Sequence, residues 1–88
     1  MTKAQVSFVR EQGVDFAVVH VRTFVMLRPH AVRDEMVAVY TRECGCPAVL
    51  MAQESGEVPT FYGRDDLVHF LSGVLVEQLP WGEITLAA

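Results

Sequence analysis

The hydrophobic pattern of the chain centres on one uninterrupted apolar run, Ala48–Ala52, which stands between two groups of turn-forming residues. Gly45-Cys46-Pro47 precedes the run, and Gln53-Glu54-Ser55-Gly56 follows it. A strand that is buried on one face alternates apolar and polar side chains, because successive side chains point to opposite sides of a sheet. This run does not alternate, so we predict a strand that is covered on both faces.

Two segments near the N-terminus predict a β-hairpin. Residues 4–9 alternate, and the mostly apolar segment 14–21 follows after the loop Glu11-Gln12-Gly13. A three-residue loop that ends in glycine suits a left-handed turn residue, since glycine has no Cβ to clash. This loop pairs Arg10 with Val14, and directly opposed residues share a face of the sheet. The predicted shared face consists of Ala4, Val6, Phe8, Phe16 and Val18.

The same kind of loop follows the central run and predicts a second hairpin. Glu54-Ser55-Gly56 pairs Val49 with Phe61 of a strand over residues 58–62. Pro59 has no N–H for a strand ladder, so we expect this strand at or near an edge of the sheet.

Two segments have helical periodicity. The first runs from about Pro29 to Cys44, where Gly45 suits a left-handed helix cap and Pro47 prevents continuation. The second begins after Gly63, and its apolar stripe consists of Leu67, Phe70, Leu71 and Val74. Residues 23–28 either extend the preceding strand or form an apolar loop.

The order of these segments predicts one α+β domain over residues 1–88. We expect a two-layer sandwich in the order ββαββα(β), a mixed or antiparallel sheet of four to five strands with two helices on one face. Residues 75–79 form an irregular turn, and 81–86 form the last strand with Ile84 and Leu86 inward. A helical crossover makes the second and third strands parallel neighbours at the sheet centre. The alternative is a βαββαβ order, in which the N-terminal hairpin competes for an edge of the second strand.

The two hairpin registers leave one apolar sheet face away from the helices. It consists of Val9, Ala17, Val19, Val21, Ala48, Leu50, Ala52 and Val58. Apolar patches larger than a few hundred Å² usually mark association sites. We therefore predict a homodimer in which this face meets its copy, with Val19, Val21, Leu50 and Val58 at the interface. Alternatively, residues 23–28 or the C-terminus cover the face within one chain.

Composition favours an associating domain. Of the 88 residues, 51% are apolar, and the mean hydropathy of +0.27 is high for a small chain with much surface. The net charge is −4 and the seven Lys and Arg residues are scattered, so we expect no nucleic-acid partner. No apolar segment approaches the roughly 20 residues that span a bilayer, so we expect no membrane association. The N-terminus lacks the apolar core of a signal peptide, and two closely spaced cysteines favour a reducing cytoplasm.

Two groups of polar side chains invite a chemical interpretation, and we interpret both as structural. Cys44 and Cys46 lie at a helix C-terminus, where the dipole opposes a lowered thiol pKa, and no histidine has ligand spacing with them. Asp65, Asp66 and His69 lie within one turn of each other on the solvent side, as a capping turn and an ion pair would. We therefore predict no catalytic residue, no metal and no cofactor.

Tyr62 and Arg64 are the candidate ligand-binding residues. Tyr62 ends a predicted strand, and Arg64 lies at a helix N-terminus beside backbone N–H groups that suit a small anion. Asp65 and Asp66 supply negative charge at the same place, which counts against an anion. His20 ends the second strand, and we interpret it as a structural imidazole.

These observations leave three hypotheses for the function. The first is a small non-enzymatic interaction or regulatory domain that acts as a homodimer through the sheet face or binds another protein. The second is a sensor domain for a small anionic ligand at Tyr62 and Arg64. The third is a small enzyme with its site at a subunit interface, so the sequence leaves enzymatic activity open.

Overall fold

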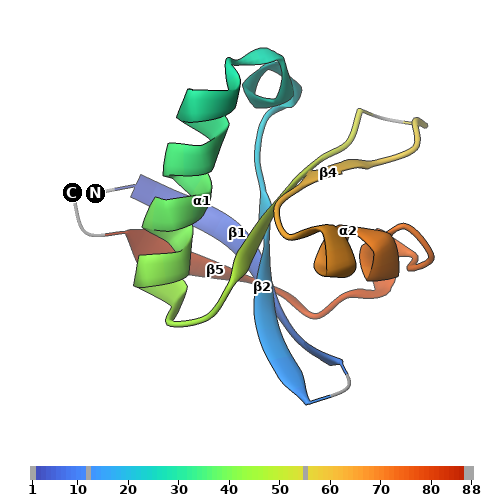
Figure 1. Ribbon diagram of the computed structural model, residues 1–88. Helices are drawn as coiled ribbons and strands as arrows, with labels where there is room; N and C mark the ends of the chain where they lie inside the picture. The colour runs from blue at the N-terminus through green and yellow to red at the C-terminus, as the bar shows by residue number, and fades with distance from the viewer. Residues whose placement is uncertain (1, 12, 55, 87–88) are drawn as a thin grey trace.

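The computed structural model describes residues 2–11, 13–54 and 56–86. It confirms the α+β class and the predicted order of strands and helices, with a five-stranded mixed open sheet and two α-helices (Figure 1). Two short 3₁₀ helices, η1 and η2, precede α1 and the last strand. The elements are β1 (Thr2–Glu11), β2 (Val14–His20), η1 (Thr23–Leu27), α1 (His30–Cys44), β3 (Ala48–Ala52), β4 (Thr60–Tyr62), α2 (Asp65–Leu71), η2 (Val76–Gln78) and β5 (Trp81–Leu86).

The strands lie in the order β4-β3-β2-β1-β5. β2 and β3 are parallel, as the helical crossover between them predicts, and the other neighbours are antiparallel. All five residues of β3 are buried, which confirms a strand covered on both faces. β4 forms one edge of the sheet and has only three residues, which agrees with the effect expected of Pro59.

The two helices lie on opposite faces of the sheet, so the prediction that both lie on one face of a two-layer sandwich is wrong (Figure 1). The strand order supplies the reason. β4 and β5 are opposite edges, so the chain between them must cross a face of the sheet, and α1 already occupies the other face. α2 lies in this crossing segment, and the result is a helix–sheet–helix arrangement of three layers.

Gly63 lies where the chain leaves β4 and turns toward α2. A Cβ added at Gly63 would lie 3.2 Å from the carbonyl oxygen of Ala48 and 3.2 Å from the Cα of Val49. Backbone atoms yield less readily than a flexible side chain, so this close approach of two chain segments favours glycine.

The first hairpin differs from the prediction by one residue. Glu11 pairs with Val14, so two residues lie between the strands instead of three. Gly13 has the expected left-handed conformation, with φ of +80°, whereas Gln12 lies outside the described residues. A one-residue change of register turns every β1 side chain to the other face. Phe8 therefore leaves the predicted face of Phe16 and is 51% exposed.

The second hairpin keeps the predicted faces although its pairing is shifted by two residues. Met51 pairs with Phe61, where the prediction paired Val49 with that residue. A shift of two preserves the faces because side chains alternate with a period of two. Gly56 has φ of +78°, as expected. Val58 precedes β4 and is 86% exposed, so it belongs to neither face.

Two apolar clusters fill the spaces between the layers. On the α1 face of the sheet, the buried residues are Ala4, Val6, Ala17, Val19, Val21, Val25, Ala48, Leu50 and Ala52. On the α2 face they are Phe16, Val18, Val49, Met51, Leu67, Leu71 and Val76. Most of the predicted interface set thus shares one face, but α1 covers it: Val19 and Leu50 are fully buried and Val21 is 9% exposed within one chain. The premise of an uncovered face is wrong.

The segment before α1 takes neither of the two forms expected for residues 23–28. It folds as the 3₁₀ helix η1, and Val25 turns inward to join the α1-face cluster. The first α-helix begins at His30 with Pro29 as its N-cap, one residue later than expected, and no side chain caps it. Its end is as predicted, because Gly45 adopts a left-handed conformation with φ of +72°.

Candidate functional site

Tyr62, one of the two predicted ligand residues, lies in a cluster of polar side chains between β4 and α1. Its hydroxyl donates a short hydrogen bond to Asp34, and this bond raises the pKa of Tyr62. A hydroxyl has one hydrogen to donate, so Nδ1 of His30, 2.6 Å from the Tyr62 oxygen, acts as the donor in that contact. The guanidinium of Arg33 lies 4.5 Å from the centre of the Tyr62 ring. The hydroxyl and the ring of Tyr62 therefore both have partners within the chain.

Arg64, the other predicted ligand residue, is matched by a neighbouring carboxylate. Its guanidinium binds Asp66 through two contacts, of 3.1 and 2.7 Å. This pairing raises the pKa of Arg64 and lowers that of Asp66. Tyr62 and Arg64 do line one cavity of about 320 Å³, but Asp34 and Asp65 line it too. The local charge disfavours the small anion that the sequence suggested.

The cysteines fit their structural interpretation. Cys44 and Cys46 are free and half-buried, and burial raises the pKa of both thiols. Among the described residues, no group of three His, Cys, Asp or Glu side chains is arranged to hold a metal ion.

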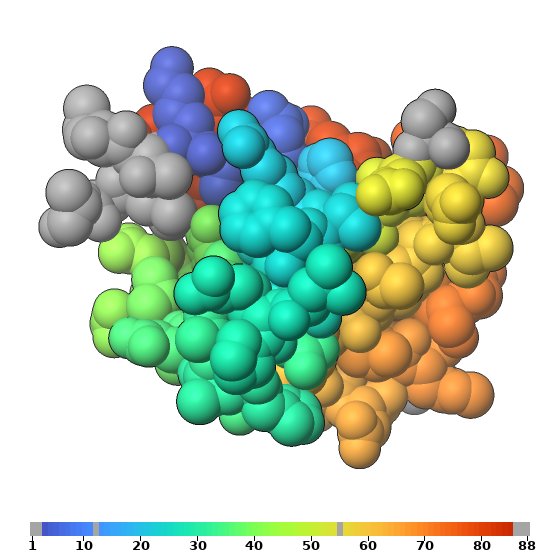
Figure 2. Space-filling view, turned by 90° about the horizontal axis from the view of Figure 1, so that it is seen from above, coloured from blue at the N-terminus to red at the C-terminus, as the bar shows by residue number. Residues whose placement is uncertain are grey.

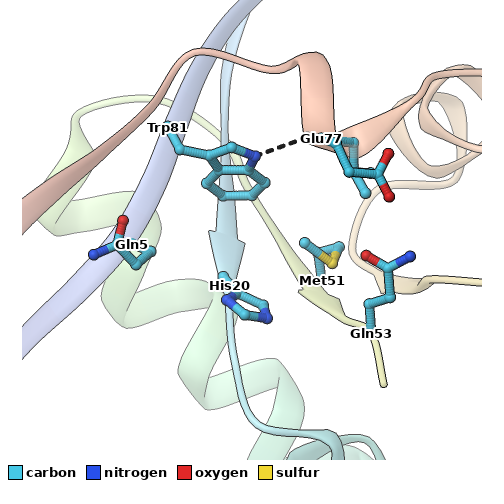
Figure 3. Close-up of a pocket in the computed structure, with 7 residues that line it drawn as sticks. Gln5, His20, Met51, Gln53, Glu77 and Trp81 are labelled. Atoms are coloured by element: carbon cyan, nitrogen blue, oxygen red, sulfur yellow. Dashed lines mark hydrogen bonds between the residues drawn. The ribbon is translucent and has the colours of Figure 1, made fainter. Parts of the chain in front are cut away.

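A second cavity, of about 200 Å³, lies on the α2 face beside Trp81 (Figure 3). It is lined by Gln5, His20, Met51, Gln53, Val76, Glu77 and Trp81. Its position follows from the sheet: His20 ends β2 and Gln53 follows β3, so the cavity opens at the carboxyl ends of the two parallel strands. This is the end at which sheets with parallel strands commonly bind ligands.

Hydrogen bonds fix the side chains around this cavity. The indole Nε1 of Trp81 donates to the carbonyl oxygen of Val76 over 2.7 Å, the dashed line in Figure 3. The amide nitrogen of Gln53 donates to the backbone of Glu57 over 2.8 Å. That of Gln5 makes a longer contact of 3.4 Å with Glu83. The indole donor of Trp81 and one donor of each glutamine amide are thus engaged, and the amide oxygens of Gln5 and Gln53 can act as acceptors.

The sequence did not identify this cavity. His20 was interpreted as structural, and Trp81 was placed only as the first residue of a strand. The cavity depends on β5 pairing with β1, which brings Trp81 and Gln5 together from opposite ends of the chain. A single Trp at the start of a strand and a His at the end of another were the only local signals.

The open edge of the sheet at β5 is a second candidate site, and hydrogen-bond directions define it. On the side of β2 that faces β3, the amide of Ala17 donates to the carbonyl oxygen of Pro47 and that of Val21 to the carbonyl oxygen of Met51, each over 2.8 Å. Neighbouring residues in a strand direct their N–H and C=O groups to opposite sides. Val18 therefore exchanges hydrogen bonds with β1, where its partner is Ser7.

The same alternation extends across β1 to β5. Because Ser7 bonds to β2, the even-numbered residues of β1, Ala4 among them, direct their groups toward β5. Ala4 pairs with Ile84, so Ile84 bonds to β1. Its neighbours Glu83 and Thr85 then direct their N–H and C=O groups away from the sheet. No strand among the described residues pairs with β5 on that side.

Large apolar side chains reach the surface at several places. Phe24 and Leu27 of η1 are 55% and 84% exposed, and Leu75 is 63% exposed. The segment that contains η1, coloured cyan, lies in the middle of the face seen in Figure 2, beside the yellow segment that leads into β4. These side chains are separate from the free edge of β5.

The chain has no match among protein-family models, curated proteins or solved structures. Among its described helices, none is long and apolar enough to cross a membrane.

Proposed function

We propose that the protein is a small, non-enzymatic, cytoplasmic interaction domain that acts as a homodimer, and that two copies join along β5. The observation that carries the proposal is the free edge of that strand, with the outward N–H and C=O groups of Glu83 and Thr85. An exposed edge is a template for another strand. Antiparallel pairing of two identical edges satisfies both copies and closes at two chains. This route replaces a dimer through the sheet face, which α1 covers.

Charge and hydrogen bonding favour one register. With Ile84 opposite its own copy, Glu83 lies opposite Thr85 of the second chain, and the outward groups of both residues find partners. Two such pairs exchange about four main-chain hydrogen bonds. A register centred on Glu83 would place two carboxylates directly opposite each other, which is destabilising. Ile84 is therefore the residue we place on the two-fold axis.

The size of this contact sets the expected affinity. Ile84 is half-buried and packs against the α1-face cluster, so two copies extend that apolar surface across the axis. One short strand pair buries less than the roughly 800 Å² per partner of a standard interface. We therefore expect a dimer whose population rises with protein concentration over the micromolar range.

Two proline variants test the edge by sedimentation equilibrium. Thr85→Pro removes an N–H that points outward, so we expect a folded monomer. Ile84→Pro removes an N–H that bonds to β1, so we expect it to lower the unfolding midpoint more than Thr85→Pro does. A wild-type monomer at high micromolar concentration would contradict the dimer. A Thr85→Pro dimer as stable as the wild-type dimer would contradict the β5 edge.

A cross-link tests the register separately. In a background with Cys44→Ser and Cys46→Ser, Ile84→Cys places one thiol opposite its copy at a distance that a disulfide can bridge with small adjustment. We expect mild oxidation to link most of this variant into covalent dimers. Glu83→Cys is the matched control and should link poorly. Faster linking of Glu83→Cys would leave the dimer in place but reject the Ile84 register.

A further inference from the structure

We infer that the cavity beside Trp81 binds a small organic cation of the quaternary ammonium type. This inference does not depend on the proposed dimer, because the cavity lies on the α2 face and not along the outward groups of β5. Three observations carry it: an aromatic wall held in place, an apolar floor, and a rim that has the carboxylate of Glu77 and no Lys or Arg.

The aromatic wall is the indole of Trp81. Its N–H is committed to the carbonyl oxygen of Val76, which fixes the orientation of the ring and leaves its face toward the cavity (Figure 3). The His20 ring lies nearby, with its centre 6.2 Å from that of Trp81. A tryptophan face attracts cations through its quadrupole and is the strongest aromatic partner for them. A quaternary ammonium group also brings methyl groups, which suit an apolar floor.

Met51 and Val76 form that floor. Each is only 3% exposed, so the base of the cavity is well packed. The cavity volume of about 200 Å³ suits a molecule of a few heavy atoms rather than a nucleotide or an extended peptide.

The polar rim selects the sign of the charge. Glu77 is the one charged side chain among the seven lining residues, and none of the seven is Lys or Arg. The amide nitrogens of Gln5 and Gln53 each donate one hydrogen bond elsewhere, to Glu83 and to the backbone of Glu57, and their amide oxygens can act as acceptors. Lys3, two residues before Gln5 in β1, forms an ion pair with Glu83 over 3.7 Å. An anion would find a carboxylate here and no cation to balance it.

Trp81 provides the readout, because it is the only tryptophan in the sequence. We would titrate the wild-type protein with choline and follow the emission of Trp81. The comparison compound is the neutral analogue of choline in which carbon replaces the quaternary nitrogen. We expect a saturable change with choline and binding about tenfold weaker with the neutral analogue, as cation–π attraction and Glu77 together predict. No saturable change with choline, or equal affinity for both compounds, would overturn the inference.

Two charge-matched variants locate the effect. Glu77→Gln removes the carboxylate of the rim, and we expect it to weaken choline binding about fivefold while leaving the neutral analogue unchanged. Glu43→Gln removes one negative charge from α1, on the other face of the sheet, and should change neither affinity. An equal loss in both variants would mean that choline responds to net charge and not to this cavity. Circular dichroism checks that both variants are folded.

Discussion

The two faces of the sheet are covered by different means, although β2 and β3 supply the centre of both. On the α1 face a helix of fifteen residues lies over small side chains, and none of its residues, all of them described, is fully buried. On the α2 face a helix of seven residues buries two leucines against larger side chains such as Phe16 and Met51. The result at the centre is the same, because residues 16–19 of β2 are all 0% exposed. On the α2 face, larger sheet side chains fill the space that the shorter helix leaves open.

This difference also decides where surface is left for function. α1 contacts β2 and β3, and α2 packs Leu67 and Leu71 into the cluster over the other face of the same two strands. Neither helix makes comparable contact with β1 or β5. The edge at Glu83 lies in that outer part of the sheet, and the cavity beside Trp81 extends from it to the carboxyl ends of β2 and β3. The short helix on the α2 face leaves Gln5 and His20 exposed at the rim of the cavity. The core thus lies on both faces of β2 and β3, whereas the candidate sites lie toward the β5 edge of the sheet.

The largest expected effect comes from placing a charge on the α1 face. Leu50→Asp puts an unpaired carboxylate at a fully buried position, which costs several kcal/mol, comparable with the whole stability of a small domain. We expect an unfolded chain by circular dichroism, whereas a dimer interface at Leu50 would give a folded monomer. Val58→Asp is the control from the same predicted interface set. It is 86% exposed and should stay folded.

The next effect is a cavity on the α2 face. Phe16 is 0% exposed and meets Phe70 edge to face, with ring centres 6.2 Å apart. Phe16→Ala should lower the free energy of unfolding by about 3–5 kcal/mol, measured by chemical denaturation. Phe8→Ala is the matched control, because Phe8 is half exposed, and we expect a loss of less than about 1 kcal/mol. Similar losses for the two variants would restore the sequence-based register.

A smaller effect is expected at Gly63, where the chain leaves β4 and turns toward α2. Gly63→Ala introduces a Cβ 3.2 Å from backbone atoms of β3, and the strain should cost about 1–3 kcal/mol in the free energy of unfolding. At Gly73 the nearest atom to an added Cβ is 3.8 Å away, so Gly73→Ala should be nearly neutral. If Gly63→Ala were equally neutral, the close passage of the chain over β3 would be wrong.

The sequence predicted the centre of the fold well because the centre is encoded locally. The unbroken apolar runs of β2 and β3 require cover on both faces wherever the rest of the chain lies. Gly45 and Gly56 likewise occupy the expected left-handed conformations, since each ends a segment that its own neighbours define. These features need no knowledge of strand order.

The register and the helix placement could not be predicted because they depend on information outside the local pattern. A left-handed glycine can close a loop of two residues or of three, so Gly13 alone does not fix which β1 side chains oppose Phe16. The face that α2 covers depends on β5 pairing with β1, at the opposite edge from β4. The cavity at Trp81 depends on the same pairing. Tyr62 and Arg64 line one cavity, but the carboxylates that bind them come from two helices, Asp34 from α1 and Asp66 from α2, which the local sequence pattern does not bring together.

The smallest expected effect concerns the ion pair at the start of α2, the short helix that covers its face. Arg64 lowers the pKa of Asp66 in the folded protein below its ordinary value of about 3.9. A lowered folded pKa contributes stability above the unfolded pKa, and that contribution is lost as pH falls through the folded value. Asp66→Asn should therefore lower the unfolding midpoint by a few degrees at most at neutral pH, since the pair is exposed to solvent. The difference between wild type and variant should shrink as pH falls below about 4. A difference that stays constant down to pH of about 2 would show that Asp66 acts through packing and not through its charge.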